Sequence, residues 1–537
     1  MKKRFLYSCL VIAASLTACN KKLDEVNTDP NRTTGTAFNP NFLMSQAQFQ
    51  FSQTGYDDLL FQSMWIQGLA STYDYYANGD KYVLRGSGTG YYGRTWNRGY
   101  GALTLVDEMK SLAVANPAYT NLNNCGTILR VLFMQRITDL YGDAPYSQEG
   151  QAKSGLITPV FDKQQAIYTA MLSQLDAATT ALDVTKASPT SDLFYAGDVA
   201  KWKRLGYSLM LRVAMRMVKV DPATAKTYAE KAYASGTMTS IADNAKVQAD
   251  YANGNGNDNA AALLVPDDFR EVRWSKTLID FMKSSTDPRV SAIAEISSGT
   301  GKAANELNDP TKGNPYGINT YALQIGMPNG YDQNGGATDI SKASNYPGTS
   351  PADPTVKNDA AAPDGKYSRP RFAVYGDRNG INMIYTYGES ELLLAEAATK
   401  GWATGVAATH YANALTADMQ TLAQLNVSAA ATVDAASVAA YVTAHPLVAA
   451  TALQQINMEY WVVTSTTFDF NEAFANWRRS GYPNLTPVVY QGQYISGSIP
   501  RRMPYPITLP QTNGTNYAAA VASMGADNFA TRVWWDK

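Results

Sequence analysis

The sequence predicts an all-α protein that carries long irregular loops. Apolar residues recur every three or four positions along many segments, which is the spacing of one helix face. The alternation of apolar and polar residues that marks half-buried strands is scarce. Two stretches, 71–95 and about 237–380, follow neither pattern and are rich in turn-forming residues. We expect them to be loops on a helical scaffold, and long loops usually carry binding groups.

In the first part of the chain, helices are expected near residues 41–70, 97–115 and 122–140. The clearest helix follows at 162–182. Asp162 can cap its N-terminus, and its apolar residues are spaced by three or four throughout. These apolar residues are Ile167, Met171, Leu175, Ala178 and Leu182.

The next helix begins near Val199 and ends before an Asp-Pro pair. Arg212 and Arg216 lie away from its apolar stripe. That stripe consists of Trp202, Leu205, Leu209 and Val213. A further helix is expected over 222–235, because proline opens it and Gly236 can end it in the left-handed conformation.

Helices are expected again in the last third of the chain, where the apolar spacing returns. An Ala-rich part, 425–452, is not predicted to cross a membrane, because Asp434 and a His-Pro pair interrupt it. The expected helices lie near 387–400, 405–424, 434–444 and 449–464.

The N-terminus has the layout of a lipoprotein signal. Three basic residues precede an apolar run, 5–16, that is too short to span a bilayer, and the run ends in Leu-Thr-Ala-Cys19, which resembles a lipobox. Residues 1–18 are therefore predicted to be removed, and Cys19 to carry a lipid anchor. Residues 19–40 are polar and turn-rich and are expected to form a tether. The helical domain then covers 41–537.

The composition of the mature chain restricts its partners. Without the signal, 42 basic and 46 acidic side chains remain. Nucleic acid is not expected as a partner, because no basic excess can replace the counterions of phosphate. Cys125 keeps no partner for a disulfide and is expected to be a buried, inert thiol.

Motifs for hydrolytic or metal chemistry are scarce. The two histidines, His410 and His445, are expected at the surface or at helix ends, and the lack of an HExxH motif nearly excludes a histidine-based zinc site. No GxSxG motif occurs, and residues 299–302 lack the first glycine and the hydroxyl of a phosphate loop. No cofactor is predicted. Asp332 and Asp339 weakly resemble a calcium loop, which a polar turn explains as well.

Aromatic side chains are concentrated in the two loop regions, together with Asn and Asp. Aromatic rings stack on the C–H faces of sugars, and the amide and carboxylate groups bind hydroxyls. This pattern favours carbohydrate binding, although about half of the rings are expected only to pack loops onto helices. The candidate ligand-binding residues are Tyr73, Tyr75, Tyr76, Asn78, Asp80, Trp274, Tyr316, Tyr321 and Tyr331.

An ordered set of segments behind the lipobox resembles the SusD/RagB family of Bacteroidetes nutrient-uptake lipoproteins. The matches are DLYGDAPY at 139–146, the helix at 167–182, TDPR at 286–289, SELLLAEA at 390–397 and RRMPYP at 501–506. They cover most of the mature chain. The family's ER…E…EG-R…DLRR stretch appears here only as Glu459 and 470–479, which resembles the divergent SusD-like subfamily.

The resemblance implies a fold of tetratricopeptide-like helix pairs with irregular loops. It also implies a protein that binds a nutrient without catalysis and acts as the lid of a SusC-like TonB-dependent transporter. Such a protein is anchored in the outer membrane by its lipid and exposed at the cell surface. The matched motifs are largely structural, so the resemblance assigns no ligand-binding residue.

The leading hypothesis is a surface lipoprotein that captures oligosaccharide and passes it to this transporter. A peptide-binding lid of the same kind remains open. An anchored α-helical glycoside hydrolase also remains open, because loop acids such as Asp267, Asp268 and Glu271 could face each other across a sugar. A purely structural surface protein is a third alternative.

Overall fold

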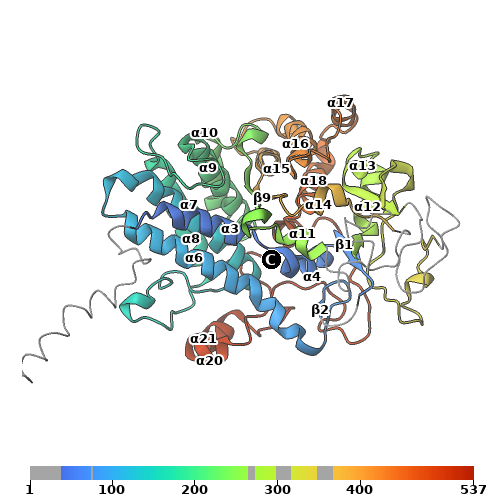
Figure 1. Cartoon of the computed structure of the whole chain (residues 1–537), viewed down its shortest axis with the longest axis horizontal. Coiled ribbons are helices and arrows are strands. Elements are labelled where there is room, and N and C mark those ends of the chain that lie inside the picture. Colours follow the sequence, from blue (N-terminus) through green and yellow to red (C-terminus); the bar gives the residue numbers. More distant parts are fainter. Residues whose placement is uncertain (1–37, 74–76, 264–271, 298–315, 348–366) are drawn as a thin grey trace, which may run out of the picture.

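The computed structural model describes residues 38–73, 77–263, 272–297, 316–347 and 367–537 (Figure 1). Helices dominate these residues, and the strands are short and form small sheets, so the predicted all-α class is confirmed. Most consecutive helices pack against each other as pairs, in a tetratricopeptide-like arrangement.

The first half of the chain contains the longest helices. The predicted helix at 41–70 is instead three short helices followed by a strand, because Gly55 adopts a positive φ and interrupts it. From α6 to α10, each helix packs against the next one along the chain. The helices are α3 (Asn41–Ser52), α4 (Gly55–Leu60), α5 (Gln62–Trp65), α6 (Arg94–Ala113), α7 (Thr120–Tyr141), α8 (Gln164–Ala181), α9 (Val199–Arg216) and α10 (Pro222–Ser235).

The last third of the chain forms a second set of packed helices, and the predicted ones are confirmed there. Three further helices there, α19, α20 and α21, are not predicted from the sequence. The helices are α15 (Tyr387–Thr399), α16 (Ala407–Thr421), α17 (Ala435–Ala444), α18 (Ala452–Thr466), α19 (Phe470–Ser480), α20 (Leu509–Thr512) and α21 (Gly514–Met524).

Helix ends follow the local sequence. The carboxylate of Asp221 accepts a hydrogen bond from the backbone N–H of Thr224, and Gly236 ends α10 with a φ of +100°. The predicted capping role of Asp162 is wrong. Its carboxylate accepts from the backbone N–H groups of Tyr146 and Ser147 instead, and so fixes the loop before α8.

The stretch 237–380, expected to be irregular, is only partly so. It contains helices and strands too short to give a readable period in sequence. These are β4 (Ala245–Gln248), α11 (Asp258–Leu263), β5 (Val272–Trp274), α12 (Lys276–Ser284), α13 (Arg289–Ile293), β6 (Ala294–Ser297), β7 (Tyr316–Ile318), β8 (Arg369–Pro370) and α14 (Phe372–Tyr375).

Antiparallel pairs join these strands to distant segments. β5 pairs with β1 (Leu69–Ser71), β4 pairs with β9 (Ile381–Tyr385), and β7, β6 and β8 form a three-stranded sheet. A small hairpin of β2 (Ala77–Asn78) and β3 (Val83–Leu84) follows β1. The two loop regions are thereby joined to each other and to the helices.

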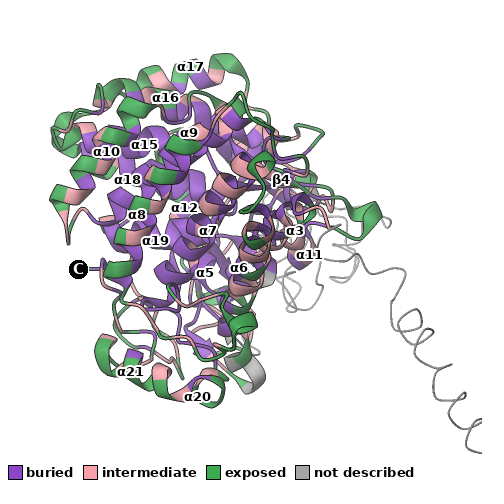
Figure 2. Cartoon of the chain, turned by 90° about the vertical axis from the view of Figure 1, so that its left-hand side faces the viewer, coloured by how far each residue is buried: buried purple, intermediate pink, exposed green. Residues whose placement is uncertain are grey.

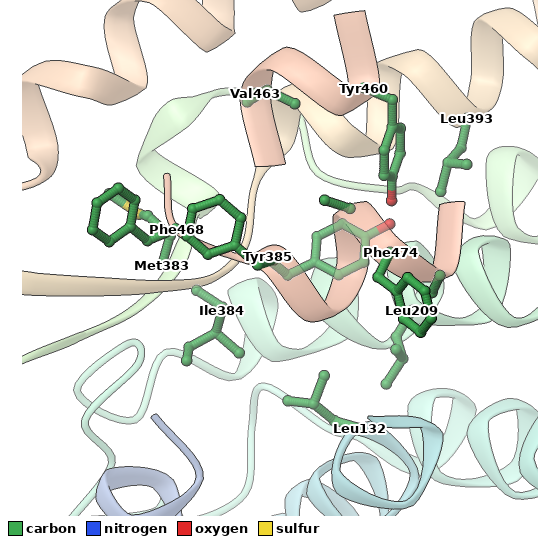
Figure 3. Close-up of a cluster of buried hydrophobic side chains, with 14 of the residues drawn as sticks. Leu132, Leu209, Met383, Ile384, Tyr385, Leu393, Tyr460, Val463, Phe468 and Phe474 are labelled. Carbon is green, nitrogen blue, oxygen red and sulfur yellow. The ribbon is translucent and has the colours of Figure 1, made fainter. Parts of the chain in front are cut away.

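One large apolar core runs through both helix sets, and Figure 2 shows it as buried ribbon surrounded by an exposed outer layer. Figure 3 shows a part of this core in which side chains from α7, α9, β9, α15, α18 and α19 meet. Tyr385 of β9 and Phe474 of α19 lie among the aliphatic side chains there. Since segments from both halves share this core, the described helices form one unit.

The core also buries charge, on the face of α9 that lies away from its apolar stripe. Arg212 and Arg216 lie off the apolar stripe but are 5% and 0% exposed. Nη2 of Arg216 contacts both carboxylate oxygens of Glu472 at 2.5 Å, and its Nε lies 3.2 Å from Asp139. Ion pairing with α7 and α19 compensates for the loss of hydration. The polar face of α9 is therefore an internal face.

Among the described residues, no single helix is long and apolar enough to cross a bilayer. The segments Ala435–Ala444 and Ala449–Thr466 reach the required length only together, and they are bent by 93° relative to each other.

Candidate functional site

The described residues form an open cavity of about 590 Å³ beside α17. Its walls are the turn between α12 and α13, residues 319–321, Arg371, and the face of α17 that carries Ser437 and Tyr441. Figure 1 places α12, α13 and α17 together on one side of the molecule. We refer to this space as the α17 cavity.

The three-stranded sheet explains why these segments meet. Ile296 of β6 lies opposite Ile318 of β7, and Ala294 of β6 lies opposite Pro370 of β8. Because both pairings are antiparallel, the beginning of β6 and the ends of β7 and β8 lie at the same end of the sheet. The residues that follow β7 and β8 therefore reach the cavity from that end.

Two of these residues present polar groups to the cavity. Nδ2 of Asn319 donates to the carbonyl of Ser291 at 2.9 Å, and Nη1 of Arg371 donates to the carbonyl of Ala430 at 2.7 Å. Both side chains are only partly buried, and neither makes a further side-chain hydrogen bond with the described residues. Their remaining donors and acceptors are available to a ligand.

Three rings line the same cavity. Tyr441 and His445 are stacked, with ring centroids 4.0 Å apart, and Nδ1 of His445 donates to the carbonyl of Tyr441 at 2.8 Å. Tyr321 comes from the opposite wall, where its hydroxyl donates to the carbonyl of Lys283 at 3.3 Å. Burial raises the pKa of Tyr441 and of Tyr321, so both phenols stay protonated.

A buried ion-pair cluster supports the ring of Tyr441. Arg289, which is 0% exposed, contacts Asp287 at 2.6 Å and Glu459 at 2.9 Å through Nη2. Its guanidinium carbon lies 6.0 Å from the centroid of the Tyr441 ring. Burial favours the neutral form of Arg289, but the two carboxylates raise its pKa well above the usual value. The TDPR motif therefore builds the floor of the cavity.

The start of α17 is fixed by its own cap. Oδ1 of Asp434 accepts from the backbone N–H of Ser437 at 2.9 Å, and Oδ2 accepts from the Ser437 hydroxyl at 2.6 Å. These hydrogen bonds lower the pKa of Asp434. Both residues line the cavity, and Ala440 and Ala444 leave room for a ligand along the helix.

Three of the predicted binding residues are internal and are corrected here. Trp274 is 0% exposed, and its Nε1 donates to the carbonyl of Ile293 at 3.0 Å. Asp80 is also 0% exposed, lies 3.3 Å from Nζ of Lys81 and accepts from the backbone N–H of Gly330. Asn78 is 1% exposed and accepts from the backbone N–H of Asp80. They join loops to the core and present no surface to a sugar.

The other predicted residues are divided among several places. Tyr321 lines the α17 cavity. Tyr73 and Tyr331 are partly buried in neighbouring loops, which are linked because Nε2 of Gln333 donates to Oγ1 of Thr72 at 2.8 Å. Tyr316 belongs to β7, and its side chain lies outside the described part. Tyr75 and Tyr76 lie outside the described residues, as do the acids Asp267, Asp268 and Glu271.

Sequence reasoning missed most of the α17 cavity. Asp434, Ser437 and Tyr441 lie in an Ala-rich helix with no aromatic cluster, and only the possible cap at Asp434 was visible as a local signal. His445 does lie at the end of α17, as predicted. His410 lies in the first turn of α16, so it is also near a helix end, but it is buried and shares a hydrogen bond of 2.9 Å with Glu391.

The weak calcium motif forms a hydrogen-bonded turn. Oδ2 of Asp332 accepts from the hydroxyls of Thr338 and Tyr490, and Oδ1 of Asp339 accepts from the backbone N–H of Ser341. In the part of the chain that the structure describes, no group of three or more His, Cys, Asp or Glu side chains is placed to hold a metal ion. The hydrogen bonds of Asp332 and Asp339 are those of a polar turn, which is the alternative to a calcium loop.

The sequence and the fold were compared with known proteins. The model of the second SusD-like family, described as "Starch-binding associating with outer membrane", matches residues 30–506. A comparison with curated proteins gave no match.

Solved structures show the same fold. A structure described as a chitin-binding protein has a TM-score of 0.75 and 29% sequence identity, and the match covers 93% of this chain and all of that one. A SusD-like structure from Bacteroidetes AC2a has a TM-score of 0.74 at 24% identity, with 93% and 100% coverage. A chitin-binding SusD homologue from Flavobacterium johnsoniae has a TM-score of 0.69 at 24% identity, with 92% and 98% coverage. The chain therefore belongs to the SusD-like family, as its ordered motifs predicted.

Proposed function

We propose that this protein captures oligosaccharides at the cell surface and that the α17 cavity is a capture site. The observation that carries the proposal is the combination of groups on its walls. The rings of Tyr321, Tyr441 and His445 share the cavity with the amide of Asn319 and the guanidinium of Arg371. Rings stack on the C–H faces of sugars, and the polar groups bind hydroxyls. The starch-binding description of the family supports the same ligand class.

Among glycans, we propose an N-acetylated glucan of the chitin type. The structure described as a chitin-binding protein is 29% identical to this chain over nearly its full length. An acetamido group offers one N–H donor and one carbonyl acceptor. The Oδ1 of Asn319 and the remaining N–H groups of Arg371 would pair with these two atoms.

The lipid anchor and the transporter are part of the same proposal. Cys19 would hold the protein at the outer membrane, and the helical body would act as the lid of a SusC-like TonB-dependent transporter. The lipobox and the family support both. Replacing Cys19 by Ala should release the protein from the outer-membrane fraction. Affinity purification of the lipidated protein should recover the transporter, and its repeated absence would contradict the partnership.

Calorimetric titration tests the capture site. The lipid-free chain should bind N-acetylchitohexaose, and Tyr321→Ala should weaken binding by about tenfold, because one stacking contact is lost. Tyr251→Ala is the matched control, since Tyr251 is 57% exposed and lies outside the cavity.

Three results would change the proposal. Equal affinities of Tyr321→Ala and the control would remove the site from the α17 cavity. Binding of a neutral hexapeptide in place of maltohexaose, cellohexaose and N-acetylchitohexaose would favour the peptide-binding lid. Release of new reducing ends from the glycan by the pure protein would favour the hydrolase.

A further inference from the structure

A second cavity, of about 640 Å³, lies far from α17. One wall is α6, the second is the loop 145–159, and the third is α20 with Asn513. Figures 1 and 2 both place α20 and α17 at opposite ends of the molecule. None of the predicted binding residues lines this space, and of the motifs only DLYGDAPY reaches it, through Pro145. We refer to it as the α6 cavity.

Its base holds two carboxyl groups that are close together. Nε of Arg130 lies 3.0 Å from Oδ1 of Asp107, and Nη2 of Arg130 lies 3.4 Å from Oε2 of Glu149. The side chain of Glu149 is only 7% exposed. Gly150 has a φ of +78°, and a Cβ there would come within 2.8 Å of Oδ2 of Asp107. The glycine therefore lets the loop approach α6 closely.

Glu149 holds a proton at neutral pH. Burial and the hydrogen bond and charge of Asp107 raise the pKa of Glu149 to about 9. Glu149 therefore keeps its proton at neutral pH and can donate a hydrogen bond, while the carboxyl oxygens of Asp107 beside it can accept one. The base of the cavity thus offers hydroxyl donor and carboxylate acceptor groups side by side.

The remaining charges at the cavity are paired. Lys153 forms an ion pair with Glu108, and Arg130 is the counter-charge of Asp107. With Glu149 protonated, these groups sum to zero. A ligand that carries a net charge would meet no unpaired partner of opposite sign there.

The walls above the base are apolar. Ile157 is 76% exposed, and Leu509 faces the same space from α20. Tyr100 is held in place, because its hydroxyl donates to the carbonyl of Pro145 at 2.8 Å and its ring centroid lies 4.7 Å from that of Trp96. An uncharged ligand with hydroxyls on its edge and C–H groups on its faces fits a polar base between apolar walls.

We infer that the α6 cavity is a second carbohydrate site, in which Asp107 and Glu149 bind neighbouring hydroxyls of a neutral sugar while Tyr100 and Ile157 contact its C–H faces. The inference shares its ligand class with the proposed function but uses different residues. Two sites at opposite ends of one protein hold a long polysaccharide at two points, so affinity rises with chain length.

The experiment is a titration of the lipid-free chain with N-acetylchitohexaose, maltohexaose and cellohexaose. Ala440→Trp blocks the α17 cavity, and Ser111→Trp places an indole at the mouth of the α6 cavity from an exposed position on α6. In the Ala440→Trp protein, at least one hexasaccharide should still bind, and adding Ser111→Trp should weaken that binding by tenfold or more.

The carboxyl pair has its own test. Glu149→Gln is isosteric with the protonated acid and should keep the affinity at pH 7, whereas Asp107→Asn should lose about tenfold for one hydrogen bond. Above pH 9 the Ala440→Trp protein should lose affinity as Glu149 ionises, and Glu149→Gln should not. The other titratable groups around Glu149 and the cavity are Asp107, Glu108, Arg130, Lys153, Tyr100 and Tyr146. Burial raises the pKa of Tyr100 and of Tyr146, so both phenols stay protonated near pH 9. All of these groups are present in the Glu149→Gln protein as well, so the difference between the two proteins reports on Glu149.

Each result is decisive. If no hexasaccharide binds to the Ala440→Trp protein, or if Ser111→Trp leaves its binding unchanged, the second site is wrong. Binding of the hexapeptide (Ser-Gly)₃ in place of the sugars would also overturn it. If instead Ala440→Trp costs no affinity and Ser111→Trp abolishes binding, the α17 cavity fails as a capture site while the α6 cavity stands.

Discussion

Arg479 of α19 and Glu396 of α15 form a buried, two-point ion pair. Nη1 lies 2.7 Å from Oε1, Nη2 lies 2.6 Å from Oε2, and the side chains are 1% and 4% exposed. The amide oxygens of Asn457 and Asn476 accept from the same guanidinium. Arg479 of α19 is thereby joined to both α15, through Glu396, and α18, through Asn457.

Removing one charge of this pair should be costly. Glu396→Gln leaves the guanidinium of Arg479 buried without a counter-charge, and the free energy of unfolding should fall by about 3–5 kcal/mol. Urea denaturation followed by circular dichroism measures it. In the control, Asp280→Asn breaks the exposed pair with Lys276 and should cost under about 1 kcal/mol. Equal effects of the two substitutions would contradict the assigned role.

The same pair predicts a pH dependence. Burial alone would raise the pKa of Glu396, but Arg479 and Lys400 lower it from 4.5 to about 2. Because the folded state binds fewer protons than the unfolded state in this range, the stabilisation is complete above pH 4.5 and disappears as the pH falls through 2. The difference in unfolding free energy between the native protein and Glu396→Gln should therefore shrink between pH 4.5 and 2. A difference that stays constant over this range would disprove the low pKa.

Trp274 is expected to stabilise the fold without contacting a ligand. Trp274→Ala should lower the free energy of unfolding by about 3–5 kcal/mol, because it leaves a cavity beside Tyr375 and Phe468. Trp274→Phe should recover most of the loss and bind N-acetylchitohexaose as the native protein does. A selective loss of glycan affinity in a stable Trp274→Phe protein would return this residue to the binding site.

Cys125 should resist modification in the folded protein. It is 0% exposed, and burial raises its pKa well above the ordinary value, so the reactive thiolate is absent. Iodoacetamide should label protein lacking residues 1–19 only after denaturant is added. Rapid labelling under native conditions would show that α7 opens locally.

Asp434→Ala should loosen α17 without unfolding the protein. The substitution removes the cap that holds Ser437 at the first turn of the helix. Hydrogen exchange of residues 435–444 should accelerate while that of α15 stays unchanged, and glycan affinity should fall with it. Exchange as slow as in the native protein would show that packing, and not the cap, orders α17.

The fold could be predicted from sequence wherever a helix buries one apolar face. The apolar spacing that begins at Ile167 predicts α8, and the stripe that begins at Trp202 predicts α9. For α10, Pro222 and Gly236 mark the two ends. The spacing failed for α19, because Glu472, Arg478 and Arg479 are charged and yet buried against charges from other helices. A pattern within one segment cannot show a partner that lies hundreds of residues away.

The candidate sites were less predictable than the fold. Aromatic density in loops identified Tyr321 but also Trp274, since a ring that packs in the core and a ring that stacks on sugar look alike in sequence. The segments around the α17 cavity are brought together by a small sheet. Its strands are two to four residues long, which is too short to give a readable pattern in sequence. Asp107 and Glu149 lie 42 positions apart, and only the fold of the loop after α7 brings them together.

The ion pair of Arg216 and Glu472 also makes the first helices depend on the last part of the chain. The two residues are 256 positions apart. The carboxylate of Asp139 accepts hydrogen bonds from both Arg216 and the indole of Trp535. Without α19, the guanidinium of Arg216 would lack the carboxylate of Glu472 and would have to stay hydrated, so α7 and α9 could not pack with water excluded. Contacts of such sequence separation form slowly. The contact between α7 and α9 at Asp139 and Arg216 is therefore complete only when α19 and Trp535 have packed against it.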